Sequence, residues 1–131
     1  MTSEPLLAAD KLNNDPRLAE AKKLILAAVA EHQETLVSVR PPRPELAANY
    51  EHQLEQFGAI RGGKTFFPYL GSGIGNGPFV ELADGSVKLD LITGIGVHGY
   101  GHSHPRLINA GIDAAMSDTV MQGNLQQNTS S

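Results

Sequence analysis

The stretch Pro78–Ile92, PFVELADGSVKLDLI, decides the fold class that this sequence predicts. It contains two runs in which apolar and polar residues alternate, on either side of the four residues Ala83–Ser86. Such alternation is typical of half-buried strands, and an Asp-Gly pair between two alternating runs is a strong signal for a tight turn. The sequence therefore predicts a β-hairpin over about 78–92.

Upstream of the hairpin, the glycine distribution divides the chain into two halves. All 14 glycines lie at or after Gly58, so residues 1–57 are free of this helix-weakening residue. Asp15-Pro16 is a typical start for a helix, and apolar residues recur after it at helical spacing. They are Leu18, Ala21, Ile25, Ala28, Val29, His32 and Leu36. We predict a helix over about 16–37, ended by the prolines of VRPPRP.

A second helix is predicted over about 44–57, so that residues 1–57 form a helical N-terminal extension. Its apolar face consists of Leu46, Tyr50, Leu54 and Phe57. Residues 58–131 then hold the hairpin, a glycine-rich loop over 94–104 and a helix over about 105–118. Pro105 suits the first position of that helix. The predicted fold class is therefore α+β, with N-terminal helices followed by a small antiparallel sheet and a further helix.

Composition excludes several classes of function. The 131 residues allow one domain with a modest core, or a piece of a longer protein. Lys and Arg number 10 against 14 Asp and Glu, without a basic run, which argues against a nucleic-acid partner. The sequence has no apolar run of roughly 20 residues and no signal-peptide pattern, so we expect a cytoplasmic protein without a membrane partner. Cysteine is absent, which excludes disulfides and thiolate ligands.

Two glycine-rich stretches resemble nucleotide-binding loops but lack the required context. Gly58–Thr65, GAIRGGKT, fits the phosphate-loop pattern, which needs a buried strand before it and a helix after it. The residues before it are charged and helical in character, and Pro68 and Gly71 follow it. We interpret this stretch as a flexible connection. Gly71–Gly77, GSGIGNG, does not give the dinucleotide fingerprint, and it precedes a strand instead of following one.

Other candidate chemical groups have simpler interpretations. Three imidazoles, those of His98, His102 and His104, lie within seven residues and could in principle bind zinc or nickel. Their glycine-rich setting offers no fixed fourth ligand, so we predict no metal site. The hairpin carboxylates are expected at a solvent-facing edge, where charge serves solubility. They are Glu81, Asp84 and Asp90. No GxSxG elbow for a nucleophilic serine occurs.

Three segments carry a resemblance to a known family when taken in order. They are FFPYLGSG (66–73), FVELADGSVKLDLITGIGV (79–97) and GHSHPRLINAGIDAAM (101–116). Together they resemble the N-terminal part of class III pyridoxal-phosphate-dependent aminotransferases, the fold type I group of acetylornithine, ornithine and 4-aminobutyrate transaminases. The match covers about residues 66–128. Matching positions are Phe67, Pro68, Gly71, Gly73, Asp84, Gly85, Asp90, Gly94 to Val97 and Gly101 to Pro105.

The resemblance implies that the chain is the N-terminal segment of a longer enzyme and forms part of its small domain. That enzyme would transfer an amino group from an amino acid or ω-amine to a 2-oxo acid, with pyridoxal 5′-phosphate as cofactor, and would be a homodimer. The five lysines do not match the family's Schiff-base motif. They are Lys11, Lys22, Lys23, Lys64 and Lys88. We therefore expect no catalytic, cofactor-binding or metal-binding residue in this chain, which would be inactive alone.

The same resemblance assigns roles to the loop. Residues that would line the substrate entrance are Ile95, Gly96, Val97, His98 and Tyr100. Residues of the structural motif are Gly101, His102, His104 and Pro105, and the two histidines would hold the loop against the helix that begins at Pro105. Two alternatives remain open from the residues: a stand-alone, non-catalytic interaction module whose N-terminal helices bury the apolar face of the hairpin, and an aminomutase with the same fold.

Overall fold

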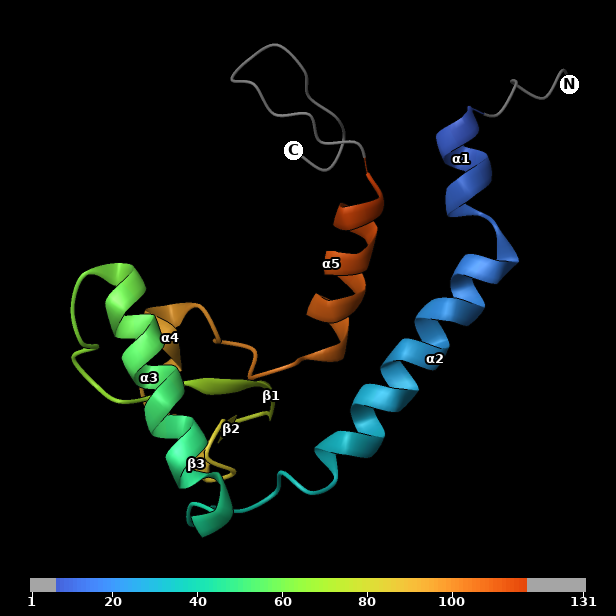
Figure 1. Cartoon of the computed structure of the whole chain (residues 1–131). Coiled ribbons are helices and arrows are strands. Elements are labelled where there is room, and N and C mark those ends of the chain that lie inside the picture. The colour runs from blue at the N-terminus through green and yellow to red at the C-terminus, as the bar shows by residue number, and fades with distance from the viewer. Residues whose placement is uncertain (1–6, 118–131) are drawn as a thin grey trace, which may run out of the picture. The chain divides into compact units, whose positions relative to one another are not determined.

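The computed structural model describes residues 7–117 and has the α+β composition that the sequence predicts (Figure 1). The helices are α1 (Ala8–Asn13), α2 (Pro16–Gln33), the 3-10 helix η1 (Pro44–Leu46), α3 (Ala47–Arg61), α4 (Thr93–Gly96) and α5 (Pro105–Met116). The strands are β1 (Gly71–Asn76), β2 (Phe79–Leu82) and β3 (Val87–Leu89). Within 7–117, no helix combines the length and apolar character that crossing a bilayer requires.

The sheet is antiparallel in the order β1-β2-β3, and its β2–β3 part is the predicted hairpin. Val80 lies opposite Lys88 across the hairpin. At the turn, the backbone N–H of Ser86 donates to Oδ1 of Asp84 over 2.8 Å, and Gly85 has a φ of 76°. An Asp side chain that bonds its own backbone and a glycine at positive φ are the features that make Asp-Gly a turn signal.

Strand β1 is an addition to the sequence prediction, which assigned no strand to Gly71–Gly77. Its residues pair with β2 through Gly71 and Leu82, Gly75 and Val80, and Asn76 and Phe79, with an irregularity between Gly71 and Gly75. Glycine disfavours a strand locally, so the extended conformation of β1 depends on its pairing with β2.

The carboxylates of the hairpin do not lie at a solvent-facing edge, contrary to our interpretation. Glu81 lies on the central strand, where Oε1 accepts a bond from Nη2 of Arg40 and Oε2 accepts one from Ser72, both over 2.9 Å. Asp84 is buried in the turn. Both carboxylates serve as hydrogen-bond acceptors within the fold, Glu81 because Arg40 and Ser72 of β1 lie beside the central strand and Asp84 because its side chain closes the turn.

Helix α2 ends at Gln33, short of the predicted end near residue 37. The carbonyl of Gln33 accepts a bond from Leu36 N over 2.9 Å and another from Asn76 Nδ2 over 3.3 Å, so the chain turns there. Nε2 of Gln33 donates to the carbonyl of Gly75 over 2.7 Å. Partners on β1 therefore end the helix, and these partners are distant in sequence. An additional short helix, α1, precedes α2 and was not predicted.

Helix α3 continues to Arg61 instead of ending at Phe57. Gly62 follows it with a φ of 80°, and the N–H of Gly63 donates to the carbonyl of Gly58 over 2.8 Å, as in a glycine-capped helix end. The first half of GAIRGGKT is thus helical, and our interpretation of that half as a flexible connection is wrong. A helix leads into the GGKT residues, whereas a phosphate loop requires one after them.

Apolar burial is confined to a small set within 32–104. Among the described residues, the buried hydrophobic side chains are Leu36, Tyr50, Leu82 and Val87. The hydroxyl of Tyr50 donates to the carbonyl of Pro68 over 2.6 Å and accepts from the N–H of Leu70 over 3.0 Å. Tyr50 therefore links α3 to the segment that leads into β1, and the core of this unit draws on both halves of the sequence.

Residues 7–31 and 105–117 belong to a second compact unit. Here Lys22 of α2 forms an ion pair with Asp113 of α5. The half-buried face of α2 consists of Leu18, Lys22, Leu26 and Val29, and not of the predicted Ala21, Ile25 and Ala28. Helix α5 begins at Pro105 and runs to Met116. The predicted helix end at Asp118 and the remainder of the resemblance up to residue 128 lie outside the described residues.

Candidate functional site

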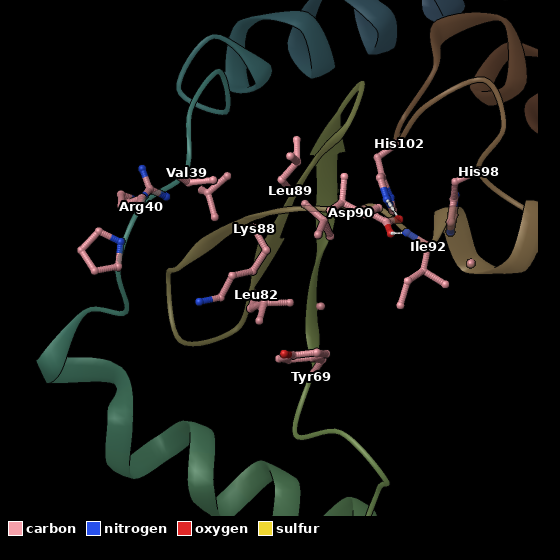
Figure 2. Close-up of a pocket in the computed structure, with 16 residues that line it drawn as sticks. Val39, Arg40, Tyr69, Leu82, Lys88, Leu89, Asp90, Ile92, His98 and His102 are labelled. Carbon is pink, nitrogen blue, oxygen red and sulfur yellow. Dashed lines mark hydrogen bonds and ion pairs between the residues drawn. The ribbon is translucent and has the colours of Figure 1, made fainter.

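The imidazole of His102 is hydrogen-bonded to the carboxylate of Asp90, which lies directly after β3. The distance from Nε2 to Oδ2 is 2.7 Å, and both side chains are largely buried. Oδ1 of Asp90 accepts bonds from the backbone N–H groups of Ile92 and Thr93 over 2.9 and 2.8 Å. The ring of His98 stacks on that of His102, with centroids 4.2 Å apart. One carboxylate therefore joins the end of β3 to the GHSHP segment (Figure 2).

The same segment packs on the β1–β2 turn through glycines. The N–H of His102 donates to the carbonyl of Gly77 over 2.9 Å. A Cβ added to Gly101 would lie 2.8 Å from Cα of Gly77, and one added to Gly75 would lie 2.5 Å from Cβ of His102. Both distances are too short for carbon atoms, so the contact depends on the absence of side chains at these glycines.

Sequence reasoning expected His102 to hold the loop against the helix at Pro105. Its imidazole is bonded to Asp90 instead, and its backbone to Gly77. The motif therefore fixes the loop to the three-stranded sheet. Asp90 was missed as a member of this site because its position at the end of an alternating run suggested a surface charge. The signal that could have identified it is local: an Asp followed by Leu-Ile-Thr can accept bonds from backbone amides two and three residues on.

These contacts determine the ionisation of Asp90. The hydrogen bond from His102 lowers the pKa of the Asp90 carboxyl below its ordinary value, and the bonds from the Ile92 and Thr93 amides act in the same direction. Burial raises the pKa, but the hydrogen bonds together outweigh it. A lowered pKa means that folding favours the ionised carboxylate. Its contribution to stability is therefore present above the pKa of the unfolded chain and is lost as the pH falls through that of the folded chain.

We predict that acid destabilises this unit partly through Asp90. In Asp90→Asn the free energy of unfolding should fall by about 1–2 kcal/mol at pH 7, because a charged acceptor of several bonds is lost. The wild-type protein should lose this increment as the pH drops below about 4, near the ordinary pKa of aspartate. Chemical denaturation between pH 3 and pH 7 measures both effects.

Glu55→Gln is the matched control for this titration, because Glu55 is an exposed carboxylate on α3. Its pH profile should follow that of the wild type. An Asp90→Asn profile parallel to the wild type across the whole range would contradict the assigned role of the carboxylate.

The residues that the resemblance assigns to a substrate entrance lie on one loop, but they differ in solvent exposure. Ile95, Val97 and Tyr100 are exposed to 92%, 72% and 77%. His98 is half-buried against His102 and lines a groove beside β3, while Gly96 is exposed. Tyr100 has its ring 6.2 Å from that of His104. The loop thus presents three apolar side chains outward and holds one imidazole against the sheet.

Several backbone conformations in this loop are unusual for their residue types. Thr93, Ile95 and Ser103 have φ values of 52°, 58° and 50°. Left-handed conformations cost β-branched residues about 1–3 kcal/mol, and they concentrate at functional sites. Because Gly94 and Ile95 both have left-handed φ values, α4 is an irregular turn and not a regular helix.

A groove of about 920 Å³ lies beside β3 (Figure 2). Most of its lining is apolar, and the remaining lining residues include two cations, a carboxylate and two imidazoles. These polar residues are Arg40, Lys88, Asp90, His98 and His102. In the part of the chain that the structure describes, no three His, Asp or Glu side chains are grouped so that they could hold a metal ion. The sequence alone does not indicate that Arg40 and Lys88 line one groove, since 48 positions separate them.

Comparison of the chain with family models, with curated proteins and with solved structures finds no match.

Proposed function

We propose that the chain is the N-terminal segment of a class III pyridoxal-phosphate-dependent aminotransferase. One observation carries the proposal: Asp90 and His102, which belong to two separate motifs of the resemblance, are bonded to each other. The contact makes the two motifs parts of one structural unit, as the resemblance requires. In the longer enzyme this segment would supply contacts at the active-site mouth and between subunits, and the lysine-bearing large domain would supply the cofactor site.

The exposed loop supports this role. A well-packed domain rarely presents Ile95, Val97 and Tyr100 together on one strained loop unless another surface covers them. Ile95 and Tyr100 would then contact the apolar part of the amino donor or the large domain. His98 would stay against His102 and fix the position of the loop. The amino transfer itself would require the cofactor and residues of that large domain.

The proposal predicts a longer reading frame and a specific kinetic defect. Sequencing of the native transcript should show coding sequence beyond Ser131 with a lysine-bearing domain. In the longer protein, Tyr100→Ala should raise the KM for the amino donor by about tenfold with a smaller change in kcat, as expected for a residue that contributes binding more than chemistry. Steady-state kinetics with saturating 2-oxo acid measures this.

Ile60→Ala is the control, because Ile60 is a large apolar residue exposed to 86% on α3 and is not part of the loop. It should leave both constants unchanged. A stop codon directly after Ser131, or a longer protein without transaminase activity, would refute the proposal.

A second candidate is a non-catalytic interaction module. It is favoured by the shared core, because Leu36 and Tyr50 from the N-terminal half are buried in the same unit as Leu82 and Val87 of the hairpin. A unit with its own core could act without a large domain. The transcript experiment distinguishes the two candidates.

A further inference from the structure

The groove beside β3 has the dimensions and lining of a small-molecule site. Its volume of about 920 Å³ lies within the range of roughly 300–1,000 Å³ that is typical of ligand pockets. Its apolar walls include Val39, Pro41, Val80, Leu82, Val87 and Leu89. These side chains come from both hairpin strands and from the segment that pairs with β3 at Arg40 and Val87. An occupant must therefore offer an apolar surface.

The charged groups of the groove differ in how far the fold already occupies them. Arg40 is engaged by the fold, since Nε donates to the carbonyl of Gly85 over 3.0 Å and Nη2 to Glu81 over 2.9 Å. Asp90 is engaged by His102 and by two backbone amides. The ammonium group of Lys88, in contrast, has no hydrogen-bond or ion-pair partner among the described residues. Among the charged groups that line the groove, the Lys88 ammonium is therefore the one whose hydrogen-bonding capacity is left for an occupant.

We propose that this groove binds an amphipathic anion, a carboxylate with an aliphatic body, whose head group pairs with Lys88. The apolar body lies along the exposed part of the walls, to which Val39 and Leu89 contribute side chains that are 65% and 46% exposed. A cation of the same shape is disfavoured because it would meet the Lys88 ammonium, while the Asp90 carboxylate is already occupied by internal donors. The inference does not rest on the proposed function, since it needs no amino group, no cofactor and no large domain.

Titration of the isotope-labelled 131-residue chain with octanoate, followed by NMR and kept below the micelle concentration, tests the proposal. Octanoate should shift the signals of Val39 and Leu89, the exposed apolar residues of the groove. Octylammonium, which has the same tail, and acetate, which lacks the tail, should each bind at least about fivefold more weakly, given the modest strength of an exposed ion pair and the loss of apolar contact.

Lys88→Met should weaken octanoate binding by about fivefold and abolish the preference over octylammonium. Lys88→Arg keeps the charge and should keep the preference, which controls for effects on folding. Lys64→Met, which removes an exposed lysine outside the groove, should change neither affinity by more than about twofold. Equal affinity for octanoate and octylammonium, unchanged binding in Lys88→Met, or shifts away from β3 would each overturn the proposal.

Discussion

Gly75→Ala is expected to destabilise the 32–104 unit by about 3 kcal/mol, the upper part of the range for overpacked sites. The added Cβ would lie 2.5 Å from Cβ of His102 and 2.6 Å from the carbonyl oxygen of Phe79. Neither neighbour can move freely, because the first is held by the Asp90 hydrogen bond and the second belongs to β2. Chemical denaturation measures the loss of unfolding free energy.

The substitution should also change the site itself. Gly75 accepts a bond from Gln33 Nε2 and donates one to Ser103 Oγ over 3.2 Å, so a shift of β1 would disturb both. We expect the imidazole NMR signals of His102 to move toward those of an unbonded histidine. A purely local steric defect would lower stability without this spectroscopic change.

Gly63→Ala is the matched control, because a Cβ at Gly63 would meet nothing within 4 Å and its φ lies outside the glycine-favouring region. Its stability should stay within about 0.5 kcal/mol of the wild type, as is usual for surface substitutions. If Gly75→Ala matched Gly63→Ala, the close packing of the GHSHP segment on β1 would be refuted.

Gly75 also illustrates which parts of the fold were accessible from sequence. The hairpin could be predicted because its signals are local: alternation, an Asp-Gly turn and short connections. Strand β1 could not, because a run such as GSGIGN has no apolar alternation and becomes a strand only by pairing with β2. The predicted C-terminal end of α2 was wrong for the same reason, since Asn76 on β1 contributes to ending the helix at Gln33.

The candidate site was accessible only in part. The motifs indicated that the loop containing His98 and His102 matters, because glycines and histidines gather there. The pairing of His102 with Asp90 was hidden, since spacing along the chain does not reveal which side chains converge. Likewise, Lys88 alternates with apolar neighbours as any strand lysine would. Its special position follows from the groove, which requires the segment around Val39 to lie beside β3.

Leu36→Ala is expected to lower the free energy of unfolding of the same unit by about 3 kcal/mol, within the range for truncating a buried leucine. Leu36 is only 1% exposed, and it belongs to the small buried apolar set of the described residues. The sequence predicted that Leu36 lies on the apolar face of a helix. Leu36 is buried instead within the 32–104 unit, after the turn that follows Gln33. Urea denaturation with two probes, fluorescence and far-UV circular dichroism, measures the effect.

Val37→Ala is the internal control, because Val37 is the next residue along the chain and is 62% exposed. Truncation to Ala, the best helix former, changes stability by only a few tenths of a kcal/mol at an exposed position. A turn that buries Leu36 and exposes Val37 predicts unequal effects, large for the first and near zero for the second. Equal losses in both variants would therefore contradict the observed helix end and the small core that depends on it.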